Sequence, residues 1–475
     1  MERRSTQTKI IATIGPACSS YEVLKQMFIE GIDVCRLNFS HGTHEDHLEE
    51  IKTIDRLNRE LNGNVAILAD LQGPKLRIGD VENNGVELVE GNEIELTTKE
   101  CLGTAERVYM SYNEFPGDVS VGDDILIDDG KLKLEVLSTN GRDTVQAKVI
   151  HGGILSSKKG VNLPSTKISL PSLTEKDIND AYFALDHDAD WIALSFVRTV
   201  TDVIDLKEII KKKKKSAKVI AKIEKPEALE EIDNIIDMAD GIMIARGDLG
   251  VEVEFDRVPL IQKTILRKCI EQAKPVIIAT QMMESMIHNF RPTRAETNDV
   301  AIAVLDGADS LMLSGETSVG KYPVEVIHSM QKIIDWTERN GFQFIREHAP
   351  KGLTKSFLPD SICYNACKMA EQTQAKAIIT FTHSGYTAFR ISSHRPDADI
   401  YAFTNNRKIM RIMSLVWGVR VFYLDEYNVM NDAIESSVKI LMDKGYIRDE
   451  DTVIHVGTIP LNKRGQTNMM KLSYV

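Results

Sequence analysis

Short apolar runs rich in β-branched residues alternate with longer amphipathic segments through most of the first 340 residues. The short runs are apolar at consecutive positions, which is typical of strands buried on both faces, and the longer segments repeat apolar residues with a helical period. The pattern predicts strands at residues 9–14, 33–37, 65–69, 191–196, 218–223, 241–245, 275–280 and 310–313. It predicts helices at residues 21–30, 44–61, 174–185, 203–213, 228–238, 258–272, 293–305 and 324–337.

Eight strand–helix units predict an α/β fold of the (β/α)8 TIM-barrel type. Two half-barrels or a doubly wound sheet would give a similar alternation, so the pattern alone leaves these alternatives open. The positions of the polar residues separate them, because a barrel collects its functional side chains at the carboxyl ends of the strands.

The alternation is interrupted between about residues 73 and 169. The helical period disappears there, and short strands are separated by turn signals such as Asn83-Asn84-Gly85 and Asp128-Asp129-Gly130. We expect an all-β domain that is inserted after the third barrel strand and, hinged at two chain crossings, acts as a lid. A second α/β pattern begins after about residue 351. The predicted domains are the first part of the barrel (1–72), the β-barrel lid (73–169), the second part of the barrel (170–345) and a C-terminal α/β regulatory domain (346–475).

Polar and charged residues gather where the predicted barrel strands end. In chain order they are Arg36, Asn38, Ser40, His41, Asp70, Ser195, Arg198, Lys222, Glu224, Arg246, Gly247, Asp248, Thr280, Gln281, Ser314 and Glu316. Loop capping alone would account for two or three of these residues but not for the whole set. The set therefore favours the barrel and predicts an active site on its carboxyl-terminal face.

Lys222 and Glu224 lie two residues apart on one predicted strand, so both side chains point toward the barrel axis. They form either a structural ion pair or a cation and a metal ligand that serve a substrate. Asp248, at the end of the neighbouring strand, favours the second interpretation. Two carboxylates completed by water and substrate oxygens suit Mg²⁺ or Mn²⁺, and the missing soft ligands argue against zinc.

Charge and composition limit the partners. The net charge of −12 argues against nucleic acid, so an anionic substrate must meet a local cluster of cations. The lysine run at residues 211–215 is predicted to be a solvated helix end, and Cys363 and Cys367 are predicted to be buried thiols on a helix. A signal-peptide core and an apolar stretch of the roughly 20 residues that span a membrane are both missing, so we expect a cytoplasmic protein with no membrane partner.

The segment Ile220-Ala-Lys-Ile-Glu-Lys-Pro-Glu-Ala-Leu229 resembles the active-site signature of the pyruvate kinase family. Other segments resemble the family's motifs in the family's order, among them Asn38-Phe-Ser-His-Gly42, Lys158-Lys-Gly-Val-Asn-Leu-Pro164, Ala245-Arg-Gly-Asp-Leu-Gly250 and Met312-Leu-Ser-Gly-Glu-Thr317. The resemblance covers essentially the whole chain. It implies phosphoryl transfer from phosphoenolpyruvate to ADP, giving pyruvate and ATP in glycolysis. A catalytically dead regulatory homologue and another phosphoenolpyruvate-handling barrel enzyme are the alternatives.

The resemblance also implies residue roles. Lys222 and Arg36 would hold the transferring phosphoryl group, and Glu224 and Asp248 would bind Mg²⁺. The remaining substrate set would be Ser195, Ala245, Arg246 and Gly247, the last three through backbone N–H groups that face the substrate carboxylate. Thr280 would lie beside the enol methylene, with Ser314 and Glu316 extending the proton network. The nucleotide would be bound by Asn38, His41, Arg77 and Lys159.

A hydroxyl-rich loop in the C-terminal domain predicts an anion site. It comprises Thr382, His383, Ser384, Gly385, Tyr386 and Thr387 and leads from a predicted strand into a predicted helix, where hydroxyl and backbone donors can face an anion. An ordinary polar connection is the alternative. In the family this position holds the phosphate of an activator, with Lys463-Arg464-Gly-Gln-Thr-Asn468 as the opposing loop. Fructose bisphosphate, AMP and ribose 5-phosphate are not distinguished, and the family implies a homotetramer.

One segment departs from the family pattern. Asn38, Ser40 and Asp70 match the family's monovalent-cation site, but Leu71 and Lys75 stand where potassium-requiring members carry Thr and Glu. Leu71 could still coordinate through its carbonyl, whereas the ammonium of Lys75 can supply the charge that K⁺ supplies elsewhere. We therefore expect the monovalent-cation-independent bacterial type, for which K⁺ is not required. A surface lysine with no role is the alternative.

Overall fold

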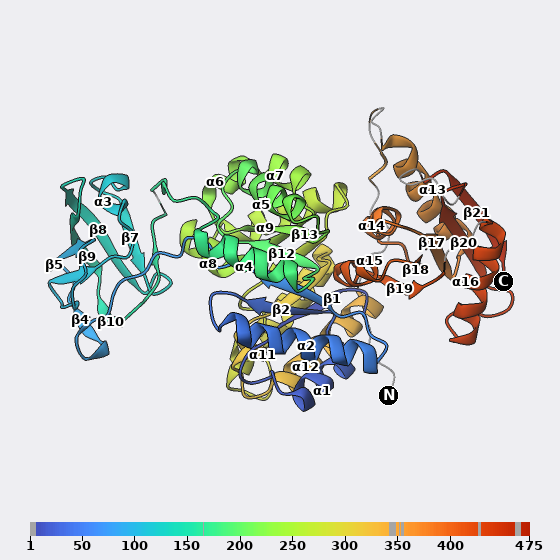
Figure 1. Ribbon diagram of the computed structural model, residues 1–475, viewed down its shortest axis with the longest axis horizontal. Coiled ribbons are helices and arrows are strands. Elements are labelled where there is room, and N and C mark those ends of the chain that lie inside the picture. The colour runs from blue at the N-terminus through green and yellow to red at the C-terminus, as the bar shows by residue number, and fades with distance from the viewer. Residues whose placement is uncertain are drawn as a thin grey trace.

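The computed structural model describes residues 6–164, 166–341, 348–350, 352, 356–425, 429–460 and 467–475. Three bodies lie in a row along the long axis: the inserted β domain at the left, the barrel in the centre and the C-terminal α/β domain at the right (Figure 1). The predicted fold class is confirmed.

Eight parallel strands close into a barrel in the order β1-β16-β15-β14-β13-β12-β3-β2, so the half-barrel and doubly wound alternatives are wrong. The strands are β1 (Lys9–Thr13), β2 (Val34–Asn38), β3 (Ala66–Asp70), β12 (Trp191–Leu194), β13 (Lys218–Ile223), β14 (Gly241–Ala245), β15 (Val276–Ala279) and β16 (Ser310–Leu313). Nearly all their residues are buried, because helices cover the outside while side chains fill the inside. Parallel pairing brings all eight carboxyl ends to one face.

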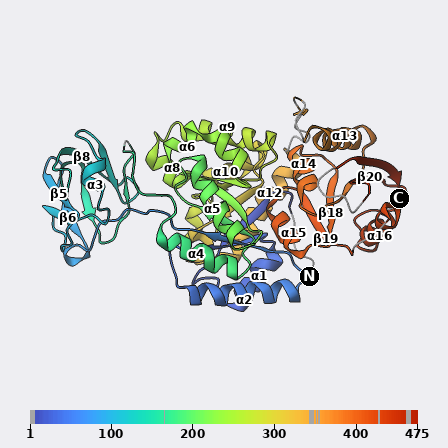
Figure 2. The ribbon, with the colours of Figure 1, turned by 45° about the horizontal axis from the view of Figure 1, so that its top comes forward.

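Helices surround the barrel (Figure 2). They are α1 (Tyr21–Glu30), α2 (His44–Glu60), α4 (Glu175–Asp186), α5 (Val200–Lys212), α6 (Pro226–Glu230), α7 (Ile232–Met238), α9 (Val258–Glu271), α10 (Arg294–Asp306) and α12 (Pro323–Asn340). Capping boxes at Thr43, Thr174 and Thr293 start α2, α4 and α10. Two short helices that the periodicity did not predict, α8 (Arg246–Glu252) and α11 (Gly315–Ser318), begin at strand ends and carry site residues.

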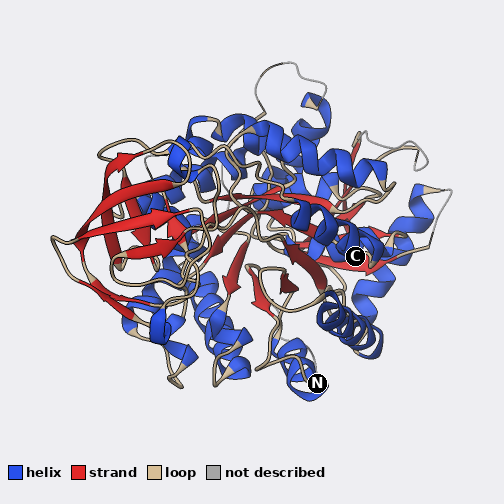
Figure 3. Cartoon of the chain, turned by 60° about the vertical axis from the view of Figure 1, so that its left-hand side comes forward, coloured by secondary structure: helices blue, strands red, loops and turns tan. Residues whose placement is uncertain are grey.

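The inserted domain has a hydrophobic core of its own, and we call this domain the lid after its expected role. It contains β4 (Val86–Leu88), β5 (Glu93–Thr97), β6 (Arg107–Tyr109), α3 (Phe115–Asp118), β7 (Asp124–Ile127), β8 (Leu132–Thr139), β9 (Thr144–His151), β10 (Gly153–Leu155) and β11 (Val161–Asn162). The strands form a six-stranded sheet, β11-β7-β8-β9-β5-β6, and a two-stranded sheet, β10-β4 (Figure 3). Asn83, Asp128 and Asp129 adopt positive φ values at turns that the sequence predicted.

The C-terminal domain is a five-stranded sheet in the order β19-β18-β17-β20-β21. Its elements are α13 (Phe357–Thr373), β17 (Ala377–Phe381), α14 (Tyr386–Ser393), β18 (Asp399–Thr404), α15 (Arg407–Ile412), β19 (Val419–Tyr423), α16 (Met430–Asp443), β20 (Thr452–Gly457) and β21 (Met469–Tyr474). It contacts the amino-terminal end of the barrel, where Lys408 and Arg411 pair with the fully buried Asp190 at 2.9 and 3.2 Å.

Two smaller predictions are confirmed. The lysine run closes α5, with Lys213 and Lys215 paired to exposed aspartates, and Cys363 and Cys367 are buried on α13. Among the described residues, every helix is too short or too polar to cross a lipid bilayer.

Candidate active site

Lys222, on β13, is the centre of a buried cluster at the carboxyl-terminal face of the barrel. Its Nζ lies 3.0 Å from Oε1 of Glu224 and 3.1 Å from Oδ1 of Asp70, and it donates a hydrogen bond of 2.6 Å to Oγ of Ser195. Burial alone would lower the pKa of Lys222, but the carboxylates of Asp70 and Glu224 raise it above its ordinary value. The lysine is therefore a fixed positive charge.

Asp70 joins this lysine to Arg36. The Nε of Arg36 donates to Oδ2 of Asp70 at 2.6 Å, and its Nη1 donates to Oγ1 of Thr13 at 2.9 Å. Burial opposes the ionisation of Asp70, but the two cations hold its pKa below the ordinary value. The ends of β2 and β13 thus present two cations that share one carboxylate.

Glu224 and Asp248 form the pair of carboxylates that could hold a divalent cation. Burial raises the pKa of the Glu224 carboxyl, Lys222 opposes that effect, and the negative charge of Asp248 adds to it. The Phe196 N–H orients Glu224 by donating to Oε2 at 2.8 Å. Two like-charged oxygen ligands held together fit Mg²⁺, whose charge would relieve their repulsion. The described residues contain no group of three or more candidate ligands, so water and substrate would complete the coordination shell.

Thr280 follows β15 with a φ of +70°, a left-handed conformation that strains a β-branched residue. Its Oγ1 accepts a hydrogen bond of 2.7 Å from the Gly247 N–H. Arg246 donates to the Thr280 carbonyl at 2.8 Å and pairs with Asp299 at 2.7 Å. Ala245 directly precedes α8, and Arg246 and Gly247 are the first two residues of that helix. The contacts of Arg246 and Gly247 with Thr280 therefore fix the predicted carboxylate-binding turn, residues 245–247, against the end of β15.

Glu316, on α11, is buried, and both of its carboxylate oxygens are in use. Oε1 accepts from the Met283 N–H at 3.1 Å, and Oε2 accepts from the Ser314 N–H at 2.7 Å. The carboxylate therefore joins the loops that follow β15 and β16, and it fixes the backbone of Ser314.

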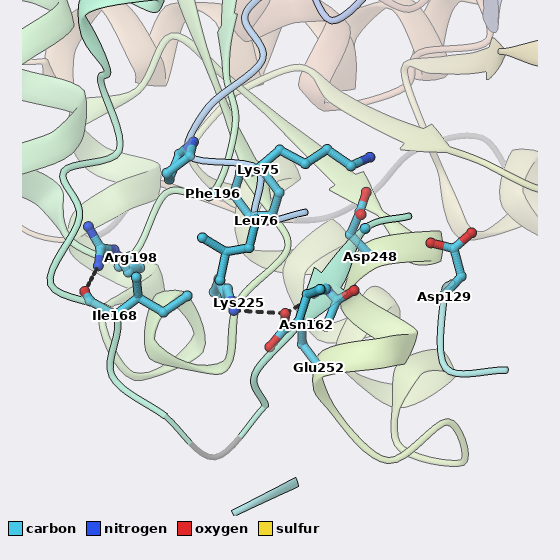
Figure 4. A pocket seen from close by; sticks show the side chains of 13 residues that line it. Lys75, Leu76, Asp129, Asn162, Ile168, Phe196, Arg198, Lys225, Asp248 and Glu252 are labelled. Atoms are coloured by element: carbon cyan, nitrogen blue, oxygen red, sulfur yellow. Dashed lines mark hydrogen bonds and ion pairs between the residues drawn. The ribbon is translucent and has the colours of Figure 1, made fainter. Parts of the chain in front are cut away.

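A cleft of about 520 Å³, open to solvent, lies between this face and the lid (Figure 4). Arg77 forms an antiparallel bridge with Gly160 at the base of the lid, which makes Arg77 and Lys159 neighbours. Lys159 pairs with Asp128 at 2.8 Å. Burial lowers the pKa of His41, and the positive charge of Arg77 lowers it further. The predicted nucleotide cations and His41 therefore lie in one neighbourhood.

Several oxygens of the predicted monovalent site already have partners. Asp70 uses its two oxygens for the two cations described above, and the Leu71 carbonyl accepts the Ser195 hydroxyl at 2.6 Å. Oδ1 of Asn38 accepts from the Ser40 N–H at 3.2 Å.

Lys75 is exposed on the cleft wall (Figure 4). Its Cε lies beside Gly160 of the lid, and its charge contributes to the lowered pKa of His41. Lys75 therefore stands between the lid and the loop that follows β2.

The predicted effector loop joins β17 to α14. Oγ1 of Thr382 accepts from the Gly385 N–H at 2.9 Å, and Gly385 adopts a φ of +87°. The Thr387 hydroxyl lies 2.8 Å from the Thr467 hydroxyl. The side chains of His383, Ser384 and Tyr386 are exposed. Residues 463–466 of the predicted opposing loop lie outside the described residues.

Three cleft residues that contact one another were not among the predicted site residues. Lys225 pairs with Glu252 at 2.7 Å, and Asn162 of the lid donates to the same carboxylate oxygen at 2.8 Å. Glu252 lies four residues after Asp248, so helical spacing from a predicted ligand was the signal that could have found it.

The closed barrel, the lysine–carboxylate cluster on its carboxyl-terminal face and the cation-bearing lid across the cleft define an enzyme for anionic substrates. Residues 5–327 match the family model of the pyruvate kinase barrel domain, and residues 360–473 match the pyruvate kinase alpha/beta domain. The chain therefore belongs to the pyruvate kinase family and is a phosphotransferase.

Individual relatives agree with this assignment. The chain is 40% identical over 473 residues to a pyruvate kinase from Geobacillus stearothermophilus and 39% identical over 471 residues to one from Staphylococcus aureus; each match spans 99% of this chain and 80% of the relative. The crystal structure of a pyruvate kinase from Cryptosporidium parvum matches with a TM-score of 0.92 at 35% identity, covering 99% of this chain and 96% of that one.

Proposed function

We propose that the chain transfers the phosphoryl group of phosphoenolpyruvate to ADP at the Lys222 cluster, giving pyruvate and ATP. The observation that carries this assignment of the site is a buried ammonium bracketed by Asp70 and Glu224, with Asp248 close by. Phosphoryl transfer needs positioning and positive charge more than covalent help, and this cluster supplies fixed charge in a site from which water can be excluded.

Lys222 and Arg36 act on the equatorial oxygens of the transferring group. Their carboxylate partner keeps both cations in place, so little reorganisation is needed when negative charge develops. Ser195, which accepts from Lys222, directs the ammonium.

Glu224 and Asp248 would hold Mg²⁺ or Mn²⁺. When bound, the ion supplies positive charge to the phosphoryl and enol oxygens. Ala245, Arg246 and Gly247 orient the substrate carboxylate through the turn at the start of α8. Because the Gly247 N–H is donated to Thr280 here, the substrate would replace that acceptor and release the Thr280 hydroxyl toward the methylene carbon. Ser314, with its backbone fixed by Glu316, supports the same proton network.

The nucleotide is bound by Arg77, Lys159, His41 and Asn38, which receive its phosphates and ribose. Lid closure carries Arg77 and Lys159 toward the barrel and removes water from the reacting groups. Lys159 exchanges its partner Asp128 for the nucleotide. No K⁺ is required, since both oxygens of Asp70 face protein cations, the Leu71 carbonyl accepts the Ser195 hydroxyl, and Lys75 adds a positive charge nearby.

The C-terminal domain binds a phosphorylated activator at the loop of residues 382–387. The chain works in the cytoplasm as a homotetramer. Exposed apolar side chains on the edge strand β21, Met470, Leu472 and Tyr474, and on α9, Leu260, support an association between copies.

A coupled assay of pyruvate release tests the proposal, with phosphoenolpyruvate, ADP and Mg²⁺ in turn omitted. We expect activity only when all three are present, together with ATP formation. Pyruvate release without ADP would indicate another phosphoenolpyruvate-handling enzyme, and no ATP under any condition would indicate a catalytically dead homologue.

A further inference from the structure

One hydrogen-bonded link between the lid and the barrel is the buried carboxylate of Glu252, and another is the donation from Arg198 to the Ile168 carbonyl. Oε1 of Glu252 accepts from Nζ of Lys225 at 2.7 Å and from Nδ2 of Asn162 at 2.8 Å, whereas Oε2 has no hydrogen-bond partner among the described residues. Lys225 and Glu252 are almost fully buried, and Asn162 belongs to β11 of the lid. We call these three residues the lid tether (Figure 4).

Each barrel residue of the tether adjoins a carboxylate of the proposed metal site. Lys225 directly follows Glu224 and precedes α6, and Glu252 lies one helical turn beyond Asp248 on α8. The tether also lines the same cleft as Asp248. The tether therefore anchors the lid to the barrel beside the proposed metal site.

On the lid side, the tether is continuous with the nucleotide cations. Asn162 is three residues from Lys159, and the intervening Gly160 bridges to Arg77. The amide of Asn162 donates to an ionised acceptor, which is stronger than a bond between neutral groups. The Oε2 of Glu252 leaves a second acceptor in the same carboxylate.

We propose that Asn162 is a positioning residue that sets the lid for ADP through Glu252, an inference that rests on the function proposed above. The tether holds Arg77 and Lys159 over the cleft. The phosphoenolpyruvate groups, which all lie on the barrel, are positioned without it. Loss of the tether therefore weakens ADP binding selectively.

The variant Asn162→Asp tests this inference, because it keeps the shape of the side chain but places a second carboxylate against Glu252. The matched control is Gln146→Glu, in which an amide that donates to Glu95 at 3.1 Å within the lid is changed in the same way. We expect the KM for ADP to rise about 10-fold or more in Asn162→Asp, the size expected for a lost bond to a charged group. The KM for phosphoenolpyruvate should stay within about two-fold, and Gln146→Glu should leave both constants there.

A second variant guards against a purely structural effect. Combining Asn162→Asp with Glu252→Gln restores a donor–acceptor pair with the roles exchanged and offers Lys225 the introduced carboxylate. We expect the KM for ADP to recover at least partly. Equal rises in both KM values, no rise at all, or no recovery in the double variant would each overturn the inference. If the proposed function itself is wrong, the unchanged chain will not form ATP from phosphoenolpyruvate, which is a separate result.

Discussion

The two ends of the barrel both carry buried carboxylates, but they use them in opposite ways. At the amino-terminal end, Asp33, Asp190, Asp240 and Asp309 each stand directly before a strand, namely β2, β12, β14 and β16. Each accepts a backbone N–H at the start of the preceding barrel strand, at 2.9 to 3.0 Å. The donor is the second residue of the strand for Asp33, Asp190 and Asp240, and the first residue, Val276, for Asp309. Every second strand of the barrel is therefore preceded by an aspartate that accepts a backbone N–H of the preceding barrel strand.

At the carboxyl-terminal end the carboxylates are crowded instead of spaced. Glu224 and Asp248 repel each other, and Thr280 has left the ordinary backbone conformation. At the amino-terminal end the carboxylates accept hydrogen bonds from backbone N–H groups and pair with Arg395 and Lys408 of the C-terminal domain. One end is built for stability, and the other stores repulsion and strain that a substrate and a cation can relieve.

The largest expected effect is a loss of activity when a charge is removed at the carboxyl-terminal end of the barrel. Lys222→Met removes the charge but keeps most of the volume, so we expect kcat to fall by at least ~10²–10³, as for the loss of one preorganised electrostatic donor. The KM values should change far less. The control is Lys218→Met, at the amino end of the same strand, whose Nζ pairs with Asp240 at 3.1 Å. Steady-state kinetics check both variants, and near-normal turnover of Lys222→Met would make that lysine a structural partner of Glu224.

The next effect is on stability and comes from the opposite end. Asp309 pairs with Arg395, which is almost fully buried, at 3.1 Å. Asp309→Asn keeps an acceptor for the Val276 N–H but leaves this guanidinium without its carboxylate, so we expect a loss of about 3–5 kcal/mol in the free energy of unfolding.

Chemical unfolding followed by tryptophan fluorescence checks this prediction, because Trp417 lies 4.9 Å from the guanidinium of Arg395. The exposed Asp397→Asn should change stability by no more than about 0.5 kcal/mol. A stability loss in Asp309→Asn equal to that of the control would contradict the assignment of the amino-terminal end to stability.

The sequence predicted the barrel well because its signals are local. A buried parallel strand needs a run of apolar residues, and the carboxyl end of that strand is where the first polar residue appears, as Lys222 and Asp70 illustrate. The inserted lid was visible for the same reason, since turn residues such as Asp128 and Asp129 replace the helical period.

Contacts between distant segments could not be predicted. Asn162 and Glu252 are 90 residues apart in the sequence, and nothing in the periodicity of either segment indicates the other. Helix α8 was missed because its seven residues are too few for a helical period. The aspartates before alternate strands were visible in the sequence, but their meaning depends on the register of neighbouring strands.

A third prediction concerns activation by a ligand of the C-terminal domain, which contacts the amino-terminal end of the barrel. Helix α14 runs from the proposed effector loop toward Arg395, the partner of Asp309. Ser384→Asp puts a negative charge where the activator phosphate would bind, so we expect basal activity to remain and activation by sugar phosphates or AMP to be lost. Asn405→Asp, an exposed change in another loop of the domain, should keep activation. Unchanged activation of Ser384→Asp would locate the effector elsewhere.

The smallest expected effect concerns K⁺ dependence at the carboxyl-terminal end of the barrel. There Lys75 adds a positive charge near Asp70, which already pairs with two cations. Asp70 is neutralised by Arg36 and Lys222, and a free K⁺ about 4 Å from the Lys75 ammonium would be repelled by roughly 4 kcal/mol at an effective dielectric near 20. We therefore expect full activity with Mg²⁺ in buffer free of Na⁺ and K⁺. Lys75→Glu should acquire partial K⁺ dependence, because it replaces the tethered charge with a carboxylate. Titration with KCl against an equal ionic strength of a bulky organic cation measures both effects, and strong stimulation of the unmodified enzyme by KCl alone would contradict the prediction.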